Sequence, residues 1–213
     1  MSADLSIDIN AGKSLERIST ILQNVPNGTS RALSAIMQRA TPKVKKVSLD
    51  GMTSVFDISK ADIRNRKNTV IKTGVKKLSG GVMGYIQYTG YQIPLIRFGV
   101  KPGNVRRQRA RVPVMVDGRW FMTSPGVPIK ARQRKDRPFT PFKNAFVAQV
   151  GSHIGLFERD TRQGLPIREI VGASAAHMAS AADVMEEAEQ AVYETIDKRV
   201  EQEISRILEG YGR

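Results

Sequence analysis

The sequence has no cysteine, only two histidines and few aromatic residues, which make up 6% of the chain. Without cysteine there is no disulfide framework, no thiol nucleophile and no thiolate-bound zinc. No apolar run approaches the roughly 20 residues that a membrane-spanning helix needs. The N-terminal residues MSADLSIDINAGKS lack the basic stretch and the apolar segment of a secretory signal. We therefore expect a protein without membrane contact that is soluble and intracellular when made.

Patterns typical of catalysis or cofactor binding are scarce. His153 and His177 lie 24 residues apart, and no carboxylate or third ligand stands at a spacing that suits a metal ion. Gly12, Lys13 and Ser14 end like a phosphate-binding loop, but the glycine that such a loop needs five residues earlier is absent. No serine lies in the setting of a nucleophile elbow. These observations predict a protein that is not an enzyme and has no cofactor or metal.

Basic residues, in contrast, are abundant. The chain has 34 Lys and Arg against 20 Asp and Glu, a net charge of +14 and a pI near 10.3. With 40% hydrophobic and 25% charged residues the composition is that of a globular protein, so the excess charge belongs to a folded surface or its loops. Such an excess favours a polyanionic partner, most often nucleic acid. An acidic protein partner is the alternative, and composition does not distinguish the two.

The charge is unevenly distributed. Residues 97–137 hold twelve basic and two acidic residues, a net charge of +10, whereas residues 183–209 hold nine acidic and three basic residues, a net charge of −6. The two regions either fold onto each other in a monomer or meet head to tail between copies. The cations proposed to contact a partner or DNA are Arg97, Lys101, Arg106, Arg107, Arg109, Arg111, Lys130, Arg132, Arg134, Lys135 and Arg137. The acidic residues proposed to contact another copy are Glu194, Asp197, Glu201 and Glu203.

Residues 14–56 have helical periodicity with a break at Pro26-Asn27-Gly28. Thr41 is the expected cap of a further helix that starts at Pro42. The composition of residues 174–208, which is rich in Ala, Glu and Met, predicts a long C-terminal helix that stops at Gly210. Its aliphatic residues recur every fourth position, so the apolar stripe should wind around the helix. They are Val184, Ala188, Val192, Ile196, Val200, Ile204 and Leu208.

Between residues 69 and 158 the apolar period changes to two, which is typical of strands. Three strands are expected at 69–78, 82–90 and 93–99, with Gly80-Gly81 as the turn between the first two. Two hairpins are expected to turn at Asp117-Gly118 and at Gly151-Ser152. In the second hairpin one face is expected to be apolar and buried. That face comprises Phe146, Ala148, Val150, Ile154 and Leu156.

The segments 100–110 and 124–144 hold five prolines among basic residues, so we expect extended loops or arms rather than central strands. The predicted fold class is α+β, in a single domain over residues 1–213. A curved antiparallel sheet would pack against N-terminal helices and a long C-terminal helix, with the basic segments as extended loops.

Four stretches, in order along the chain, carry a resemblance to a known family. The most specific are AFVAQVGSHIGLFERD at 145–160 and GLPIREIVGASAAHMAS at 164–180, and the weaker ones are RALSAIMQRATPKVKK at 31–46 and IPLIRFG at 93–99. Together they resemble the minor tail protein Z family of long-tailed bacteriophages. Residues 101–144, which include the basic segments, are not matched.

The resemblance implies a virion structural protein that acts at the head–tail junction, in the neck or in tail completion. The expected partners are further copies in a ring, for example a hexamer, and other neck and tail proteins such as a tail terminator and a head–tail connector. Genomic DNA in the channel is a further expected contact. The protein would be in the host cytoplasm during assembly and then in the virion. The alternative is a free, non-specific DNA-binding protein.

Overall fold

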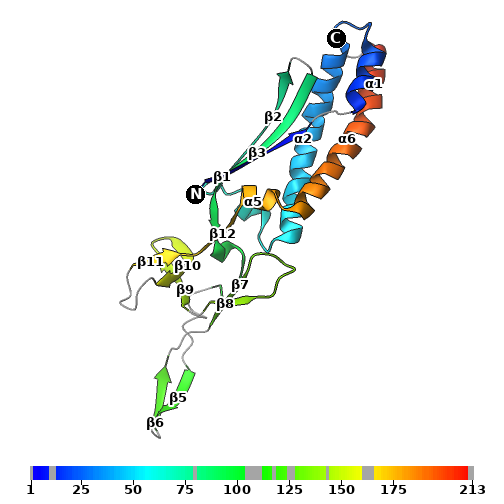
Figure 1. Ribbon diagram of the computed structural model, residues 1–213. Coiled ribbons are helices and arrows are strands. Elements are labelled where there is room, and N and C mark those ends of the chain that lie inside the picture. Colours follow the sequence, from blue (N-terminus) through cyan, green and yellow to red (C-terminus); the bar gives the residue numbers. More distant parts are fainter. Residues whose placement is uncertain are drawn as a thin grey trace. The chain divides into compact units, whose positions relative to one another are not determined.

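The protein has an α+β fold, as predicted (Figure 1). The structure is a computed structural model, and it describes residues 2–9, 13–78, 81–103, 112–116, 119–123, 128–142, 144–159 and 166–210. The chain forms two compact units. Unit 1 comprises Met1–Met52, Arg64–Tyr91 and Ala175–Arg213, and unit 2 comprises Thr53–Ile63 and Gln92–Ser174. The single domain expected from the length stays a prediction.

A sheet with β3 (Gly81–Pro94) at its centre forms one layer of unit 1. β3 pairs antiparallel with β1 (Ser2–Ile9) on one side and with β2 (Thr69–Leu78) on the other. Alternate side chains of β3, including Ile86 and Tyr88, are buried. The predicted strands at 69–78 and 82–90 are confirmed, with Leu78 opposite Gly81. Of the predicted turn, Gly80 lies outside the described residues.

The N-terminal strand β1 is not among the predicted elements, the first of which is the helix that begins at residue 14. Its sequence SADLSIDI alternates acidic or polar residues with apolar ones. Ile7 and Ile9 are buried, whereas Asp4 and Asp8 on the opposite face are exposed. This two-residue period is the usual signal of a half-buried strand.

The helices α1 (Lys13–Leu22), α2 (Gly28–Val55) and α6 (Ala182–Leu208) lie side by side in unit 1 (Figure 1). The predicted break between α1 and α2 is confirmed, and Asn27 there has a φ of +56°. The helix start predicted at Pro42 is wrong, because α2 runs through this residue. The Thr41 hydroxyl does not cap a new helix but donates to the Met37 carbonyl one turn earlier, at 2.8 Å.

The predicted C-terminal helix is divided. Ser174 ends strand β12 (Val171–Ser174), and a short helix α5 (Ala175–Ala179) precedes α6. Gly210 follows the end of α6 with a φ of +83°, so the predicted stop is confirmed.

Five of the seven residues in the predicted apolar stripe of α6 are buried, and Val192 and Leu208 are not among the buried residues. Leu208 is 57% exposed. All the buried positions together recur after three or four residues, with adjacent pairs at 195–196 and 203–204, as expected for one face of an α-helix with 3.6 residues per turn. They are Val184, Ala188, Ala191, Thr195, Ile196, Val200, Glu203, Ile204 and Ile207.

Unit 2 consists of small antiparallel sheets and short helices. One sheet has the order β4 (Gly99–Lys101), β7 (Ile129–Arg132) and β8 (Thr140–Phe142). Another has the order β11 (Ile167–Glu169), β10 (His153–Arg159) and β9 (Ala145–Val150). The hairpin predicted around Asp117-Gly118 is formed by β5 (Val112–Val116) and β6 (Arg119–Thr123), while its two turn residues lie outside the described part. The other elements are α3 (Lys60–Ile63), the 3₁₀ turn η1 (Leu95–Arg97) and β12, which pairs with the end of β3.

Two strand predictions in unit 2 need correction. The strand expected at 93–99 is replaced by the end of β3, the turn η1 and the start of β4. The segment 124–144 is not simply an arm, because β7 is the central strand of its sheet. The alternation of buried Ile129 and Ala131 with polar neighbours makes this strand, and Pro141 sits in the outer strand β8, where a missing N–H is tolerated. Within 100–110, residues 104–110 lie outside the described part.

The hairpin at Gly151-Ser152 is confirmed, but its buried face was predicted wrongly. A two-residue turn pairs Val150 with His153 and Leu156 with Val147, so even-numbered residues of β9 lie opposite odd-numbered residues of β10. Phe146 therefore shares a face with Phe157, whereas Leu156 lies on the other face. Leu156 is fully buried, but Ile154 and Val150 are 42% and 54% exposed.

Candidate interaction surfaces

The first candidate is the outward face of the sheet β4–β7–β8, which we call the cationic sheet. Along β7, Lys130 and Arg132 alternate with the buried Ile129 and Ala131 and therefore point to the other face. Lys101 of β4 stands directly opposite Lys130. Two like charges in such a cross-strand pair repel each other, so this arrangement suits a surface that meets negative charge.

An aromatic ring supports these cations. The Lys101 ammonium and the Arg132 guanidinium each lie 4.6 Å from the centre of the Phe139 ring. Attraction to the negative face of a ring stabilises a cation by about 0.5–1 kcal/mol at an exposed site. Phe139 therefore holds two cations close together on one face of the cationic sheet.

Arg132 has a second, structural partner. Its Nε donates to the Asp57 carboxylate at 2.6 Å. Gly99, opposite Arg132, leaves the space for this pair, because a Cβ at that position would collide with the Asp57 carboxylate. Arg132 thus joins β7 to the segment that precedes α3, and its charge is largely compensated within unit 2.

The next two cations also act within unit 2. The Arg134 Nε donates to the Asp136 carboxylate at 3.1 Å, and the guanidinium lies 5.5 Å from the centre of the Phe56 ring. The hydrogen bond from Arg134 lowers the pKa of Asp136. The Lys135 ammonium donates to the Thr53 carbonyl at 2.6 Å. Residues 132–135 therefore fasten two parts of unit 2 to each other.

The proposed contact cations thus separate into three groups. Lys101, Lys130 and Arg137 are exposed, and Arg97 is exposed with its guanidinium 3.7 Å from the Asp62 carboxylate. Those with structural partners are Arg132, Arg134 and Lys135. Those outside the described residues are Arg106, Arg107, Arg109 and Arg111.

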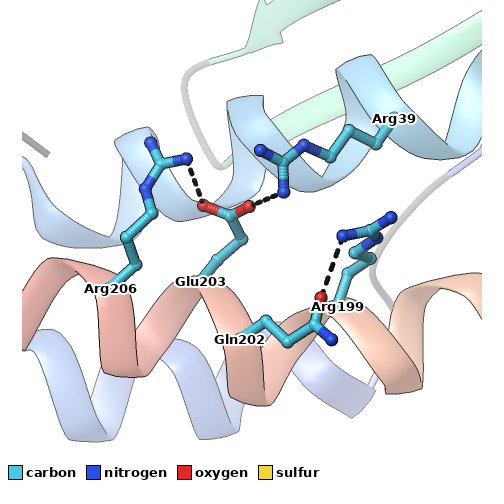
Figure 2. A network of polar contacts seen from close by, with 5 residues as sticks. All are labelled: Arg39, Arg199, Gln202, Glu203 and Arg206. Atoms are coloured by element: carbon cyan, nitrogen blue, oxygen red, sulfur yellow. Dashed lines mark hydrogen bonds and ion pairs between the residues drawn. The ribbon is translucent and has the colours of Figure 1, made fainter. Parts of the chain in front are cut away.

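The second candidate is the acidic surface of α6, for which the sequence suggested Glu194, Asp197, Glu201 and Glu203. The prediction that Glu203 contacts another copy is wrong, because this side chain is only 1% exposed. Figure 2 shows Arg39 of α2 reaching across to the Glu203 carboxylate at 2.5 Å, while Arg206 approaches its other oxygen at 3.5 Å. Glu203 is thus an internal partner that joins α2 to α6.

The other three acidic residues are exposed on α6. The Glu201 carboxylate lies 2.5 Å from the Arg17 guanidinium of α1, in a pair whose side chains are both more than half exposed. Such a pair contributes little to stability. Glu194 accepts a hydrogen bond from Gln190 at 3.0 Å. Glu194, Asp197 and Glu201 therefore form the acidic surface that remains available to a partner.

A histidine–carboxylate pair in unit 2 was not predicted. His153 Nε2 lies 2.6 Å from the Glu169 carboxylate, and the His153 ring meets Phe157 edge-on at 6.5 Å between ring centres. Gly155 lies between them, where any Cβ would collide with the Glu169 carboxylate and the Phe157 ring. The pairing of β10 with β11 creates this contact across 16 residues of sequence, so no spacing rule would have found it.

Such a pair can fix the tautomer and the orientation of an imidazole. In the described part of the chain, no three His, Cys, Asp or Glu side chains come together as metal ligands. Likewise, none of the helices there is long and apolar enough to span a membrane. The arrangement as a whole presents charged surfaces built on strands and on one helix.

Comparisons of the chain with family models, with curated proteins and with solved structures found no match.

Proposed function

We propose that this protein is a virion structural protein at the head–tail junction of a long-tailed phage, where its copies form a ring in the neck or in tail completion. The observation that carries the proposal is the separation of opposite charges onto different elements. Unit 2 has 17 Lys and Arg against 7 Asp and Glu, whereas α6 has 8 acidic and 3 basic residues. A protein with separated charges is suited to repeated contacts between copies.

The resemblance of residues 145–160 and 164–180 to the minor tail protein Z family supports the same proposal. The cationic sheet would then meet either genomic DNA in the channel or an acidic surface of a neighbouring virion protein. Lys101 and Lys130 would make this contact, because both are exposed and they lie directly opposite each other on the neighbouring strands β4 and β7. The acidic surface of α6 would serve contacts between subunits.

The decisive experiment locates the protein in particles of a phage that carries this gene. Deleting the gene should give filled heads and tails that fail to join into infectious particles. Electron microscopy of the wild-type particle should then show density for the chain at the junction. A deletion mutant that yields normal infectious particles would refute the proposal.

Non-specific DNA binding by the free protein is the second candidate, and the exposed pair of Lys101 and Lys130 favours it. A monomer of this kind would bind duplex DNA with an affinity that falls steeply with salt. The structural protein should instead bind DNA weakly until its copies are assembled. Titration of the purified monomer with duplex DNA at two salt concentrations separates the two functions.

A further inference from the structure

The sheet of unit 1 has two outer strands. β1 and β2 each pair with β3, and no strand among the described residues pairs with the outer edge of either. An outer strand offers unpaired backbone groups to another strand, as in aggregation, strand exchange or strand addition. Each of these strands is long, with 8 residues in β1 and 10 in β2.

The two outer strands carry opposite charges at the same spacing. Asp4 and Asp8 of β1 lie opposite Thr89 and Tyr85 of β3, on the face of the sheet turned away from the buried Ile86 and Tyr88. Lys72 and Lys76 of β2 lie on this same face, and the Lys76 ammonium sits 4.8 Å from the centre of the Tyr85 ring. All four charged side chains are exposed.

We propose that β1 of one copy pairs with β2 of the next copy, with Asp4 beside Lys72 and Asp8 beside Lys76. Both strands run antiparallel to β3, so they are parallel to each other. When the two copies keep their buried sheet faces on the same side, the new pair is parallel as well. Because each strand spaces its two charges four residues apart, one register satisfies both ion pairs. A parallel ladder can hold them on one face, since alternate side chains share a face.

The inner face of the sheet fits the same register at Leu5 and Ile7, whereas Ile9 would lie beside the exposed Lys77. This register places Leu5 beside Thr73 and Ile7 beside Val75, all on the face that carries the buried residues of β3. Leu5 and Val75 are each partly exposed in the single copy. The pairing would therefore extend the apolar layer of one subunit into the next. A shift by one residue would turn these side chains to opposite faces, so this register is favoured over its neighbours.

This contact is heterologous, because two different strands meet. Repeating it gives a closed ring when the rotation between copies closes and a filament when it does not. The inference rests on the proposed function in one respect, since the ring gives copies of the chain a reason to meet. The register itself comes from the two strands.

The absence of cysteine in the natural chain makes disulfide cross-linking a direct test. The variants Asp4→Cys/Lys72→Cys and Asp8→Cys/Lys76→Cys each place two thiols beside each other in the proposed register. The variant Asp4→Cys/Lys76→Cys is the matched control, because its thiols would be displaced by four residues, about 13 Å along the strand. Within one chain β3 separates β1 from β2 by about 10 Å, beyond the reach of a disulfide. Any cross-link therefore joins two copies.

Mild oxidation of the concentrated full-length protein should give a ladder of linked copies from both register-matched variants and at least tenfold less from the control. Equal cross-linking of all three variants, or none from the matched pairs, would overturn the proposal. Rings or other oligomers of the wild type that appear without matched cross-links would reject this edge contact but leave the virion role standing. A matched ladder from a protein that a gene deletion shows to be dispensable for particles would retain the edge contact and reject the virion role.

Charge exchange gives a second readout that does not depend on thiols. Lys72→Glu with Lys76→Glu should abolish self-association, and so should Asp4→Lys with Asp8→Lys. Mixing the two variants in equal amounts should restore long assemblies in which the variants alternate. The Asp residues on β1 of the first variant then meet the Lys residues on β2 of the second, and the introduced Lys residues on β1 of the second meet the introduced Glu residues on β2 of the first. If either of these two variants by itself self-associates as the wild type does, as measured by sedimentation, the proposed ion pairs are contradicted.

Discussion

The charged residues of units 1 and 2 stand in contrasting relations to the fold. In unit 1 the sheet and helices are held by buried apolar side chains such as Ile36, Met37 and Ile86, and the charges of β1 and β2 lie on the opposite, open face. In unit 2 the side chains of Arg132 and Lys135 themselves connect separate segments. An exposed charged side chain can thus bind a partner without loss of stability only where apolar packing, and not that side chain itself, stabilises the fold.

The largest expected effect comes from placing a charge in the apolar part of unit 2. Leu156→Asp should destabilise the protein by several kcal/mol, since a carboxylate would be buried without a partner. Ile154→Asp is the matched control, because it lies two residues away on the same strand and is 42% exposed. Chemical denaturation of both variants measures the difference. Equal destabilisation would contradict the exposure of Ile154.

Glu203 is the exception within unit 1, because there a buried charge joins two helices. Arg39→Met should cost about 2–3 kcal/mol, since it removes the closest partner of a buried carboxylate. The double variant Arg39→Met/Glu203→Met should recover most of that loss, because no unpaired charge is then buried, and Arg206, which loses its contact with Glu203, is exposed to water. Arg199→Met is the control, because this guanidinium on the same helix as Glu203 donates to the Gln202 side chain at 2.9 Å (Figure 2). Additive losses in the double variant would show that the pair is not coupled.

Substitution of a cation in unit 2 should reduce stability only where that cation has a partner within the unit. Arg132→Ser should lower the free energy of unfolding by about 1–2 kcal/mol, because Asp57 loses a hydrogen bond from a charged group. Lys130→Ser on the same strand should leave stability unchanged, as Lys130 is exposed. Thermal unfolding of the two variants provides the comparison. A change of the four residues Arg132, Arg134, Lys135 and Arg137 together would therefore perturb the fold, contrary to the expectation that this segment is a free arm.

The free cations should affect binding without affecting the fold. If the cationic sheet meets DNA, Lys101→Ser/Lys130→Ser should reduce the slope of log affinity against log salt by about two in assembled protein, one for each lost phosphate contact. In a phage that carries the gene, the same variant should lower the yield of infectious particles. Full infectivity with unchanged DNA binding would reduce this face to an ordinary solvated surface.

Local sequence patterns predicted most helices and strands, but they did not predict which distant segments contact each other. β2 matches its predicted bounds, because a run of β-branched residues there is closed by glycine and serine. The buried face of the β9–β10 hairpin was predicted wrongly for a geometric reason. Across its two-residue turn, even-numbered residues of β9 pair with odd-numbered residues of β10. Glu203 looked like an ordinary exposed acid of a charged helix, and only the position of Arg39 on α2 gives it a buried partner. The alternation in β1 was present in the sequence and would have been found by testing for a two-residue period.

The smallest expected effect concerns a neutral polar contact in the core of unit 1. Tyr88 is fully buried, and its hydroxyl donates to the Ser48 hydroxyl at 3.1 Å. Burial raises the pKa of Tyr88 above its ordinary value of 10.0, which the hydrogen bond to Ser48 opposes. The folded protein therefore keeps this proton to a higher pH than the unfolded chain does, so the contribution of Tyr88 to stability is present below pH 10.0 and falls as pH rises above it.

Tyr88→Phe tests this contact, because phenylalanine fills nearly the same volume but cannot titrate. Near pH 8 the variant should be less stable than the wild type by about 1 kcal/mol, since the buried Ser48 hydroxyl loses its partner. Above pH 10 the difference between the two proteins should shrink, because only the wild type then loses stability through this group. Tyr91→Phe is the control, as Tyr91 is 63% exposed and should show no such convergence. A stability difference that stays constant from pH 8 to pH 11 would show that Tyr88 titrates alike in the folded and unfolded chains.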